Sequence, residues 1–205
     1  MRRMIAALQV SLDGYIEGPD GQQDWIDTWE DVFELAPQID TCVLGGKTYP
    51  GYAQYWHAAR TAPDAPLPFT GAIASPGERR YAEFAEGTPH VVLSTTIASV
   101  DWGRATLARS LDEVRQLKAL PGRDIYAVGG ATLVSSLVNA SLVDEIRLVI
   151  HPVVLGGGKA LFSGVTGRRA LELTAVTQLG SSRLRLIYRT ASPDAGGLTS
   201  RMQPA

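Results

Sequence analysis

The sequence predicts an α/β layer fold, in which an early parallel sheet is covered by helices on both faces and antiparallel strands follow at the end. Three observations predict it. Up to about residue 140, short apolar runs alternate with helix-like segments, as strands and crossover helices do. Glycine pairs directly follow two of the apolar runs, at 45–46 and 129–130. From residue 144 onward, strand-like segments follow one another without helices between them.

Composition predicts one globular domain. The chain has 205 residues, of which 45% are hydrophobic and 20% are charged, and its formal net charge is −2. The sequence lacks the excess of basic residues that would indicate nucleic-acid binding. It also has no apolar run near the roughly 20 residues that span a membrane. The segment Met1-Arg2-Arg3 precedes only a short apolar stretch, which makes a poor signal peptide. We expect a soluble, cytoplasmic protein with neither a membrane nor a nucleic-acid partner.

In the first half of the chain, the almost entirely apolar run 4–10 predicts a buried strand. A helix is predicted at 24–36, because Trp25, Trp29, Val32 and Ala36 fall on one helical face and Pro37 stops the helix. The other predicted elements are a strand at 41–44, a helix from Thr48 to about Trp56, a surface excursion at 57–77 rich in Ala and Pro, and a helix from Ser75-Pro76 to about Ala85.

In the second half, Ser110 and Glu113 form a capping box, which predicts a helix that begins there and ends near Leu120. The last strand alternates arginines with Leu184, Leu186 and Tyr188, which predicts that its arginine face is wet. The remaining predicted elements are strands at 90–93, 124–128, 144–155, 171–179 and 183–190 and a helix at 131–139. The folded domain is expected over 1–191, with a frayed tail at 192–205.

Three strand ends carry small or hydroxyl residues, in the segments 44–48, 93–96 and 128–132. In an open α/β sheet, ligands bind beyond the carboxyl ends of the strands. A helix N-terminus offers free N–H groups to a phosphate, and glycine lets the backbone approach it. The two glycine junctions could therefore hold a pyrophosphate, with Lys47 adding charge; the alternative is that each Gly-Gly only turns the chain. The segment Gly156–Lys159 lacks the upstream glycine of a P-loop, and we interpret it as a tight turn or a bulge.

Acidic residues cluster around the predicted helix at 24–36. Asp31 borders its apolar stripe and could face a pocket, although a capping role is the alternative, and Glu30 borders the other side. Both remain candidate catalytic acids. The three histidines lack metal-ligand spacing, so no metal site is predicted, and Cys42 is expected to be an inert core residue.

Several motifs, in this order, resemble the dihydrofolate reductase-like superfamily, and most closely the reductase domain of the bifunctional riboflavin-biosynthesis deaminase-reductase and its stand-alone bacterial relatives. The motifs are Ile5–Leu8, Ser11–Ile16, Asp24-Trp25, Leu44–Tyr49, Leu93–Thr95, Val128–Leu133, Leu142–Ile146 and Pro152–Gly156. The likeness covers about residues 3–190. It implies a single-domain three-layer sandwich whose eight-stranded, mostly parallel sheet has antiparallel C-terminal strands and binds NADPH.

The resemblance also implies roles for particular residues. Ala7 and Ile16 would lie near the nicotinamide, Asp31 corresponds best to the substrate-binding acid, and Asp13 and Trp25 would border the substrate pocket. The remaining cofactor contacts would be Gly45, Gly46, Lys47, Thr48, Leu93, Ser94, Thr95, Val128, Gly129, Gly130, Ala131 and Thr132. Relatives usually carry a basic residue at the position of Gly46, where it helps to bind the 2′-phosphate. NADH is therefore an alternative cofactor, unless Lys47, Arg79 or Arg80 compensates.

The resemblance implies an NADPH-dependent oxidoreductase of the riboflavin-biosynthesis type. Hydride would pass to a C=N or C=O group of a pterin- or pyrimidine-type small molecule, as in 5-amino-6-(5-phosphoribosylamino)uracil reductase or dihydrofolate reductase. The alternative is a non-catalytic nucleotide-binding module of the same fold. A homodimer, as in riboflavin-branch relatives, is a further expectation.

Overall fold

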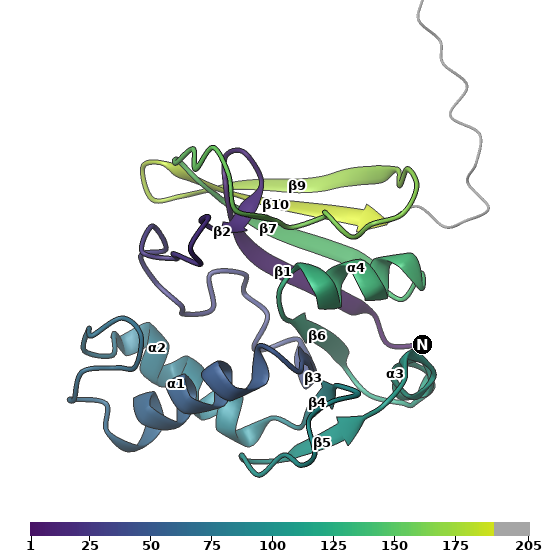
Figure 1. The fold of residues 1–205 in the computed structure, drawn as a ribbon, viewed down its shortest axis with the longest axis horizontal. Helices are drawn as coiled ribbons and strands as arrows, with labels where there is room; N and C mark the ends of the chain where they lie inside the picture. The colour runs from purple at the N-terminus through teal and green to yellow at the C-terminus, as the bar shows by residue number, and fades with distance from the viewer. Residues whose placement is uncertain (191–205) are drawn as a thin grey trace, which may run out of the picture.

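An eight-stranded sheet forms the centre of the molecule. The computed structural model describes residues 1–190, and the expected tail at 192–205 lies outside the described residues. Across the sheet the strand order is β5-β4-β3-β6-β1-β7-β10-β9 (Figure 1). The strands are β1 (Met4–Ser11), β3 (Ile39–Gly45), β4 (His90–Leu93), β5 (Ala105–Ala108), β6 (Asp124–Val128), β7 (Glu145–His151), β9 (Leu171–Leu179) and β10 (Arg183–Thr190). A separate two-stranded sheet pairs β2 (Tyr15–Glu17) with β8 (Lys159–Ala160).

The strand directions confirm the predicted fold class. Every pairing from β5 across to β7 is parallel. The pairings of β10 with β7 and with β9 are antiparallel. A parallel sheet needs crossover connections, and the helices supply them.

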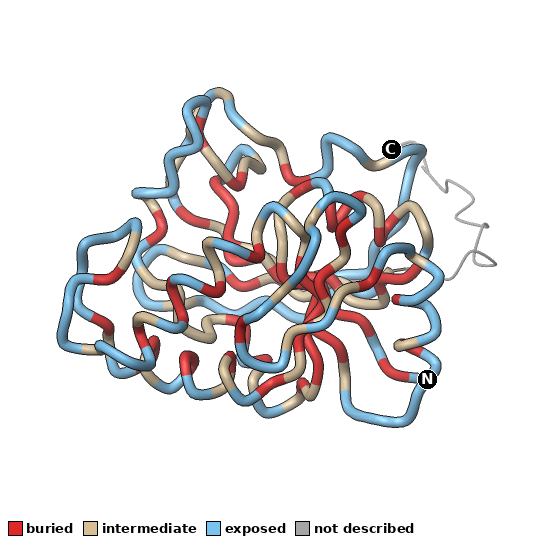
Figure 2. Tube along the Cα trace, turned by 60° about the horizontal axis from the view of Figure 1, so that its bottom comes forward, coloured by how far each residue is buried: buried red, intermediate tan, exposed pale blue. Residues whose placement is uncertain are grey.

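Helices cover both faces of the parallel part of the sheet. One apolar cluster packs α1 (Tyr49–Thr61) and α2 (Pro76–Gly87) against one face. The other cluster packs α3 (Leu111–Ala119) and α4 (Ala131–Asn139) against the opposite face. The buried residues gather along the central strands between these two layers (Figure 2).

The predicted helix at 24–36 is wrong, because this segment is a chain of turns that lies against the sheet. Glu34 has a φ of 56°, which ends any right-handed helical path. Side chains of the sheet take the carbonyl groups that a helix would use internally: Arg185 donates to Val32 and Arg147 donates to Phe33. The apolar stripe is also different, since the buried residues of the segment are Ile26, Phe33 and Leu35.

The wet arginine face predicted for the last strand is also wrong in part. Arg185 is buried, whereas Leu184 is 42% exposed. The segment 24–36 covers the arginine face of β10, where Arg185 pairs with Glu34 and Arg183 pairs with Asp27.

Three smaller differences concern two element boundaries and a set of short strands. Helix α1 continues past Trp56 to Thr61, so the surface excursion after it is shorter than predicted. Strand β7 ends at His151, before the predicted end at 155. The short strands β2, β5 and β8 were not predicted.

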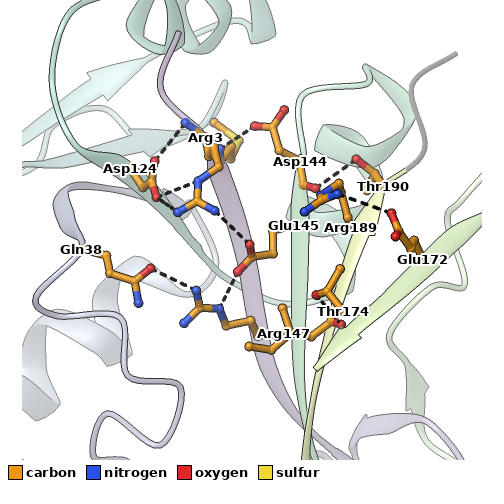
Figure 3. A network of polar contacts seen from close by, with 12 residues as sticks. Arg3, Gln38, Asp124, Asp144, Glu145, Arg147, Glu172, Thr174, Arg189 and Thr190 are labelled. Carbon is orange, nitrogen blue, oxygen red and sulfur yellow. Dashed lines mark hydrogen bonds and ion pairs between the residues drawn. The ribbon is translucent and has the colours of Figure 1, made fainter. Parts of the chain in front are cut away.

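A polar network ties the chain start to the middle of the sheet (Figure 3). Arg3, which directly precedes β1, pairs with Asp124 of β6 and with Glu145 of β7. Glu145 also pairs with Arg147, whose guanidinium reaches Gln38 and the carbonyl of Phe33. The network therefore connects three strands to the end of the segment 24–36.

Candidate functional site

A cavity of about 830 Å³ opens along the carboxyl halves of β1, β3, β4 and β6. These strands are neighbours or next neighbours in the sheet, so their ends converge. The segment 24–36, helix α1 and the N-terminus of α4 complete its walls. The predicted site residues that line it are Ala7, Ile16, Glu30, Asp31, Gly45, Gly46, Lys47, Thr48, Leu93, Ser94, Thr95, Val128, Gly129, Gly130 and Thr132.

The two helices that begin at this cavity have uncapped N-termini. Thr48 precedes α1 and Gly130 precedes α4, and neither provides a side-chain cap. By contrast, Ser75 caps α2 and Ser110 caps α3. An uncapped helix N-terminus leaves backbone N–H groups and a positive dipole end available to an anion. Two such ends on neighbouring strands β3 and β6 fit a pyrophosphate.

The glycines at these junctions are held in close contact with the rest of the site. A Cβ atom at Gly46 would lie 2.7 Å from Ser94 Oγ, and one at Gly129 would lie 2.8 Å from Leu133 Cδ2. A larger residue at either position would therefore displace its neighbour. The glycines therefore allow the ends of β3, β4 and β6 to lie close together, in addition to turning the chain.

Position 46, where the resemblance implies a basic residue, is occupied by Gly46. Of the three residues predicted to compensate, Lys47 lines the cavity, whereas Arg79 pairs with Asp64 and neither Arg79 nor Arg80 lines it.

Sequence reasoning missed Arg109. Its guanidinium donates to the carbonyls of Ser94, Ile97 and Ala98 and so holds the loop after β4.

Lys159 is a second missed residue. The segment 156–158 makes the predicted tight turn, with φ values of 70° at Gly156 and 122° at Gly158. The turn delivers Lys159 to the cavity, where its Nζ atom lies 3.2 Å from Glu17 Oε1 and beside Gly130. The position of Lys159 directly after three glycines was the sequence feature that could have indicated a site residue.

The two candidate acids both reach the cavity but differ in their bonding. The backbone N–H groups of Leu35 and Ala36 donate to the two carboxylate oxygens of Asp31, at 2.9 and 2.7 Å. The alternative of a helix-capping role for Asp31 is wrong, because the segment is not helical; its carboxylate instead stabilises the turn that follows it. Among the described residues, Glu30 is hydrogen-bonded only through its backbone, to Thr28 and Val32.

Aromatic side chains line the rest of the cavity, around α1. They are Trp29, Phe33, Tyr52, Tyr55, Trp56, Phe69, Tyr81 and Tyr126. Glu78 fixes part of this wall, because its buried carboxylate accepts a hydrogen bond from Tyr55 Oη at 2.8 Å and also caps α2. Burial raises the pKa of the Tyr55 phenol above its usual range, with Glu78 adding to the effect. The Tyr55 phenol is therefore uncharged at neutral pH, and its hydroxyl is already bonded to Glu78.

Three predicted residues lie outside the cavity lining. Asp13 accepts hydrogen bonds from the Ser11 hydroxyl and from the N–H groups of Leu155 and Gly156. The Ser11 bond is the main cause of its lowered pKa. Trp25 packs edge-on against His151, with ring centroids 5.2 Å apart. Ala131 is the first residue of α4 and does not line the cavity.

Over residues 1–190, no group of three metal-binding side chains is found and no helix is long and apolar enough to cross a membrane. Cys42 is fully buried, and burial raises the pKa of its thiol.

The fold and site define a single α/β domain of the dihydrofolate reductase-like class. A dihydrofolate reductase from Enterococcus faecalis, complexed with NADP(H), has a TM-score of 0.62 and 17% identity, with 93% of this chain and 97% of that chain covered. This level of identity shows the fold alone.

The chain belongs to the RibD C-terminal domain family, which matches residues 2–184. YyaP of Bacillus subtilis (strain 168) is 36% identical over 191 residues, which cover 91% of this chain and 94% of YyaP.

Two further solved structures share the fold. A protein from Shewanella sp. PV-4 named for riboflavin biosynthesis has a TM-score of 0.67 and 21% identity, covering 93% of this chain and 99% of that one. The diaminohydroxyphosphoribosylaminopyrimidine deaminase/5-amino-6-(5-phosphoribosylamino)uracil reductase of Thermotoga maritima has a TM-score of 0.61 and 14% identity. Here 93% of this chain matches 57% of the larger protein.

Proposed function

We propose that the protein is an NADPH-dependent reductase that transfers a hydride to a C=N or C=O group of a pyrimidine- or pterin-type heterocycle. One observation carries the proposal: two uncapped helix N-termini, after neighbouring strands β3 and β6, open on the same cavity as two carboxyl groups and an aromatic wall. The first feature suits a dinucleotide pyrophosphate and the second suits a flat, nitrogen-rich substrate. Family membership supports the same activity.

The residues at the strand ends fit the cofactor. The backbone N–H groups of Lys47 and of residues 130–132 would bind the pyrophosphate, with the side chains of Lys47 and Lys159 adding positive charge. The N–H groups of Gly46 and Thr48 already donate to the carbonyls of Leu93 and Gly45. Ser94 and Thr95 would lie along the adenosine side. Ala7 and Ile16 are buried and would form an apolar seat for the nicotinamide ring. When bound, NADPH supplies the hydride.

The two acids would act on the substrate. Asp31 is fixed by two backbone N–H groups, so its carboxylate has a defined orientation toward the cavity. Glu30 keeps its carboxylate oxygens free of hydrogen bonds within the described chain and would accept N–H groups of the heterocycle. Either carboxyl group, directly or through a water molecule, would deliver the proton that accompanies the hydride. The aromatic wall would exclude other water from the reacting atoms.

The proposal is tested by fluorescence titration of the purified protein with NADPH and, in parallel, with NADH. We expect saturable binding of NADPH, followed by cofactor oxidation when pyrimidines or pterins are added. Preference for NADH would keep the reductase but change the cofactor. Binding of neither at millimolar concentration would overturn the proposal.

Gly46 favours a second candidate, a nucleotide-binding module without reductase activity. A Cβ atom at this position would lie 2.7 Å from Ser94 Oγ, so the basic side chain that the resemblance implies there would displace the Ser94 side chain. A module of this kind would bind NADPH saturably and would oxidise it with none of the candidate substrates.

A further inference from the structure

The charged side chains of the cavity are distributed unevenly. The only lysines or arginines among its described lining residues are Lys47 and Lys159. Lys47 belongs to the glycine junction after β3, and Lys159 lies beside Gly130 and pairs with Glu17. Both cations therefore stand where the proposed function puts the cofactor phosphates.

The remainder of the cavity, which we call the aromatic half, has a different character. It is formed by Trp29, Phe33, Tyr55, Trp56 and Phe69, together with the carboxyl groups of Glu30 and Asp31. Within the described chain, no lysine or arginine lines this half. An anionic group placed there would meet two carboxyl groups and no counter-charge.

The N-terminus of α2 offers no phosphate site either. Helix α2 begins beside the aromatic half, but Ser75 and Glu78 already form a capping box there. The Glu30 carboxylate also lies against Gly77 in the first turn, since a Cβ atom at Gly77 would lie only 1.5 Å from Glu30 Oε2. Two carboxyl groups thus occupy the surroundings of the α2 helix end.

Phe69 provides an aromatic surface at the mouth of this half. It lies in a tight turn between Pro66 and Ile73, which form an antiparallel bridge. Its φ is 67°, an uncommon conformation for a bulky residue, and its side chain is 76% exposed while its ring lies over Gly51. A strained backbone that presents an exposed ring to a cavity indicates a ligand contact.

We infer that the aromatic half takes a planar, unphosphorylated heterocycle that carries N–H donors, with its ring against Phe69 and its N–H groups donating to Glu30. The inference rests on the proposed function, because that function assigns the two lysines to the cofactor. It separates this protein from a reductase whose substrate carries a ribosyl phosphate.

The test compares two ligands that differ only in the phosphate: 5-amino-6-(ribosylamino)uracil and 5-amino-6-(5-phosphoribosylamino)uracil. Binding of each to the full-length protein saturated with NADPH is measured by isothermal titration calorimetry under anaerobic conditions. We expect the unphosphorylated compound to bind at least about tenfold more tightly, because like charges oppose the phosphate. Equal binding, or tighter binding of the phosphorylated compound, would overturn the inference.

Variants identify the residues responsible. Glu30→Gln should reduce the preference at least about threefold, since it removes one of the two opposing carboxyl groups. Glu83→Gln makes the same change at an exposed residue of α2 outside the cavity and should leave the preference unaltered. Phe69→Ala should weaken both ligands equally, because both share the heterocycle. A preference unaffected by Glu30→Gln would remove Glu30 from this role.

The proposed function and the inference about the substrate are overturned by different results. If NADPH itself does not bind, the proposed function fails, and with it the assignment of the two lysines to the cofactor. If NADPH binds and the phosphorylated ligand is preferred, only the inference about the substrate fails.

Discussion

Asp31 and Glu30 are adjacent in the chain, yet their carboxylates have different surroundings. Asp31 accepts two backbone N–H groups and so fixes the turn that ends at Ala36. Glu30 accepts no side-chain hydrogen bond from the described residues and lies against the first turn of α2. The first acid is therefore oriented by the fold, and the second is left available to a ligand.

The substitution Asp31→Asn separates orientation from chemistry. The amide NH₂ group of asparagine would face one of the two backbone N–H groups, so we expect a loss of about 1 kcal/mol in the free energy of unfolding, measured in urea. Turnover should fall far more than cofactor affinity, because the cofactor contacts lie on other strand ends. Unchanged turnover would remove Asp31 from the mechanism.

His90 is a buried residue whose ionisation links stability to pH. It is 1% exposed, its Nδ1 lies 2.7 Å from the carbonyl of Thr88, and its Nε2 has no partner in the described chain. Desolvation lowers its pKa from 6.5 to about 4, with the Thr88 bond opposing the shift. The folded protein therefore holds His90 neutral.

This shift predicts acid destabilisation between pH 6.5 and 4. In that window the unfolded chain binds a proton that the folded chain does not, so the free energy of unfolding falls as the pH falls, by up to about 3 kcal/mol. His90→Phe keeps a ring between Tyr52 and Trp102 and should flatten this part of the pH dependence, measured by urea unfolding at several pH values. Identical slopes for the two proteins would contradict the assignment.

At the scale of elements, the segment 24–36 is a case in which the local sequence pattern predicts the wrong structure. Its spacing of Trp25, Trp29, Val32 and Ala36 matches a helix, but its backbone carbonyls are satisfied by arginines that lie more than a hundred residues later in the chain. A long-range contact of this kind overrides a local pattern and leaves no mark in the segment itself. The same contact explains why the arginine face of β10 is covered.

The strand-to-helix junctions could be predicted because their signals are local. A glycine pair directly after an apolar run, followed by helix formers, identifies both a strand end and a helix start. Such ends meet at one edge of a parallel sheet, so sequence reasoning placed Gly45–Thr48 and Gly129-Gly130 close together. The contributions of Arg109 and Lys159 depend on where loops fold back, which no local pattern specifies.

Arg147 is one of the side chains that attach the segment 24–36 to the sheet. Its guanidinium and the Glu145 carboxylate are 8% and 14% exposed. Arg147→Met should cost about 2–3 kcal/mol in the free energy of unfolding, because it leaves a buried carbonyl and carboxylate with fewer donors. Hydrogen exchange should become faster in the segment 24–36, and substrate affinity should fall while cofactor affinity is kept.

The matched control is Arg189→Met, in the neighbouring strand β10. Arg189 and its partner Glu172 are each 68% exposed, so this change should stay within about 0.5 kcal/mol of the parent protein. Equal losses for the two variants would contradict the attachment role of Arg147.

At the scale of the whole molecule, the sheet continues beyond the helices that cover it. β9 and β10 lie at the end of the molecule away from α1 and α2 (Figure 1). The pairing register puts Leu148 opposite Leu186, and Leu186 opposite Val176. A shift in register between Ile187 and Tyr188 brings the earlier leucines of β9 onto the same face. The exposed apolar members of this face are Leu171, Leu173, Val176 and Leu184, which are 40%, 51%, 55% and 42% exposed.

We propose that a second copy of the chain covers this face. The paired positions on it in β7, β9 and β10 carry no charge, so the face is complementary to itself, as a two-fold symmetric interface requires. Charged residues are placed on the opposite face, where Glu172 pairs with Arg189. An apolar sheet face of this kind, ending in an unpaired edge strand, is otherwise an aggregation hazard.

The proposal predicts a dimer whose dissociation follows from charging this face. Light scattering at several concentrations should give twice the monomer mass for the parent protein. The double substitution Val176→Lys and Leu184→Lys should give the monomer mass, because burying two unpaired ammonium groups opposes association. The double substitution Ala175→Lys and Thr177→Lys puts the same charge on the other face of β9, opposite Ile187 and Arg185, and should leave the dimer intact. If the parent protein is a monomer at every concentration, or if this second double substitution dissociates it as fully as the first, then a second copy does not bind through this face.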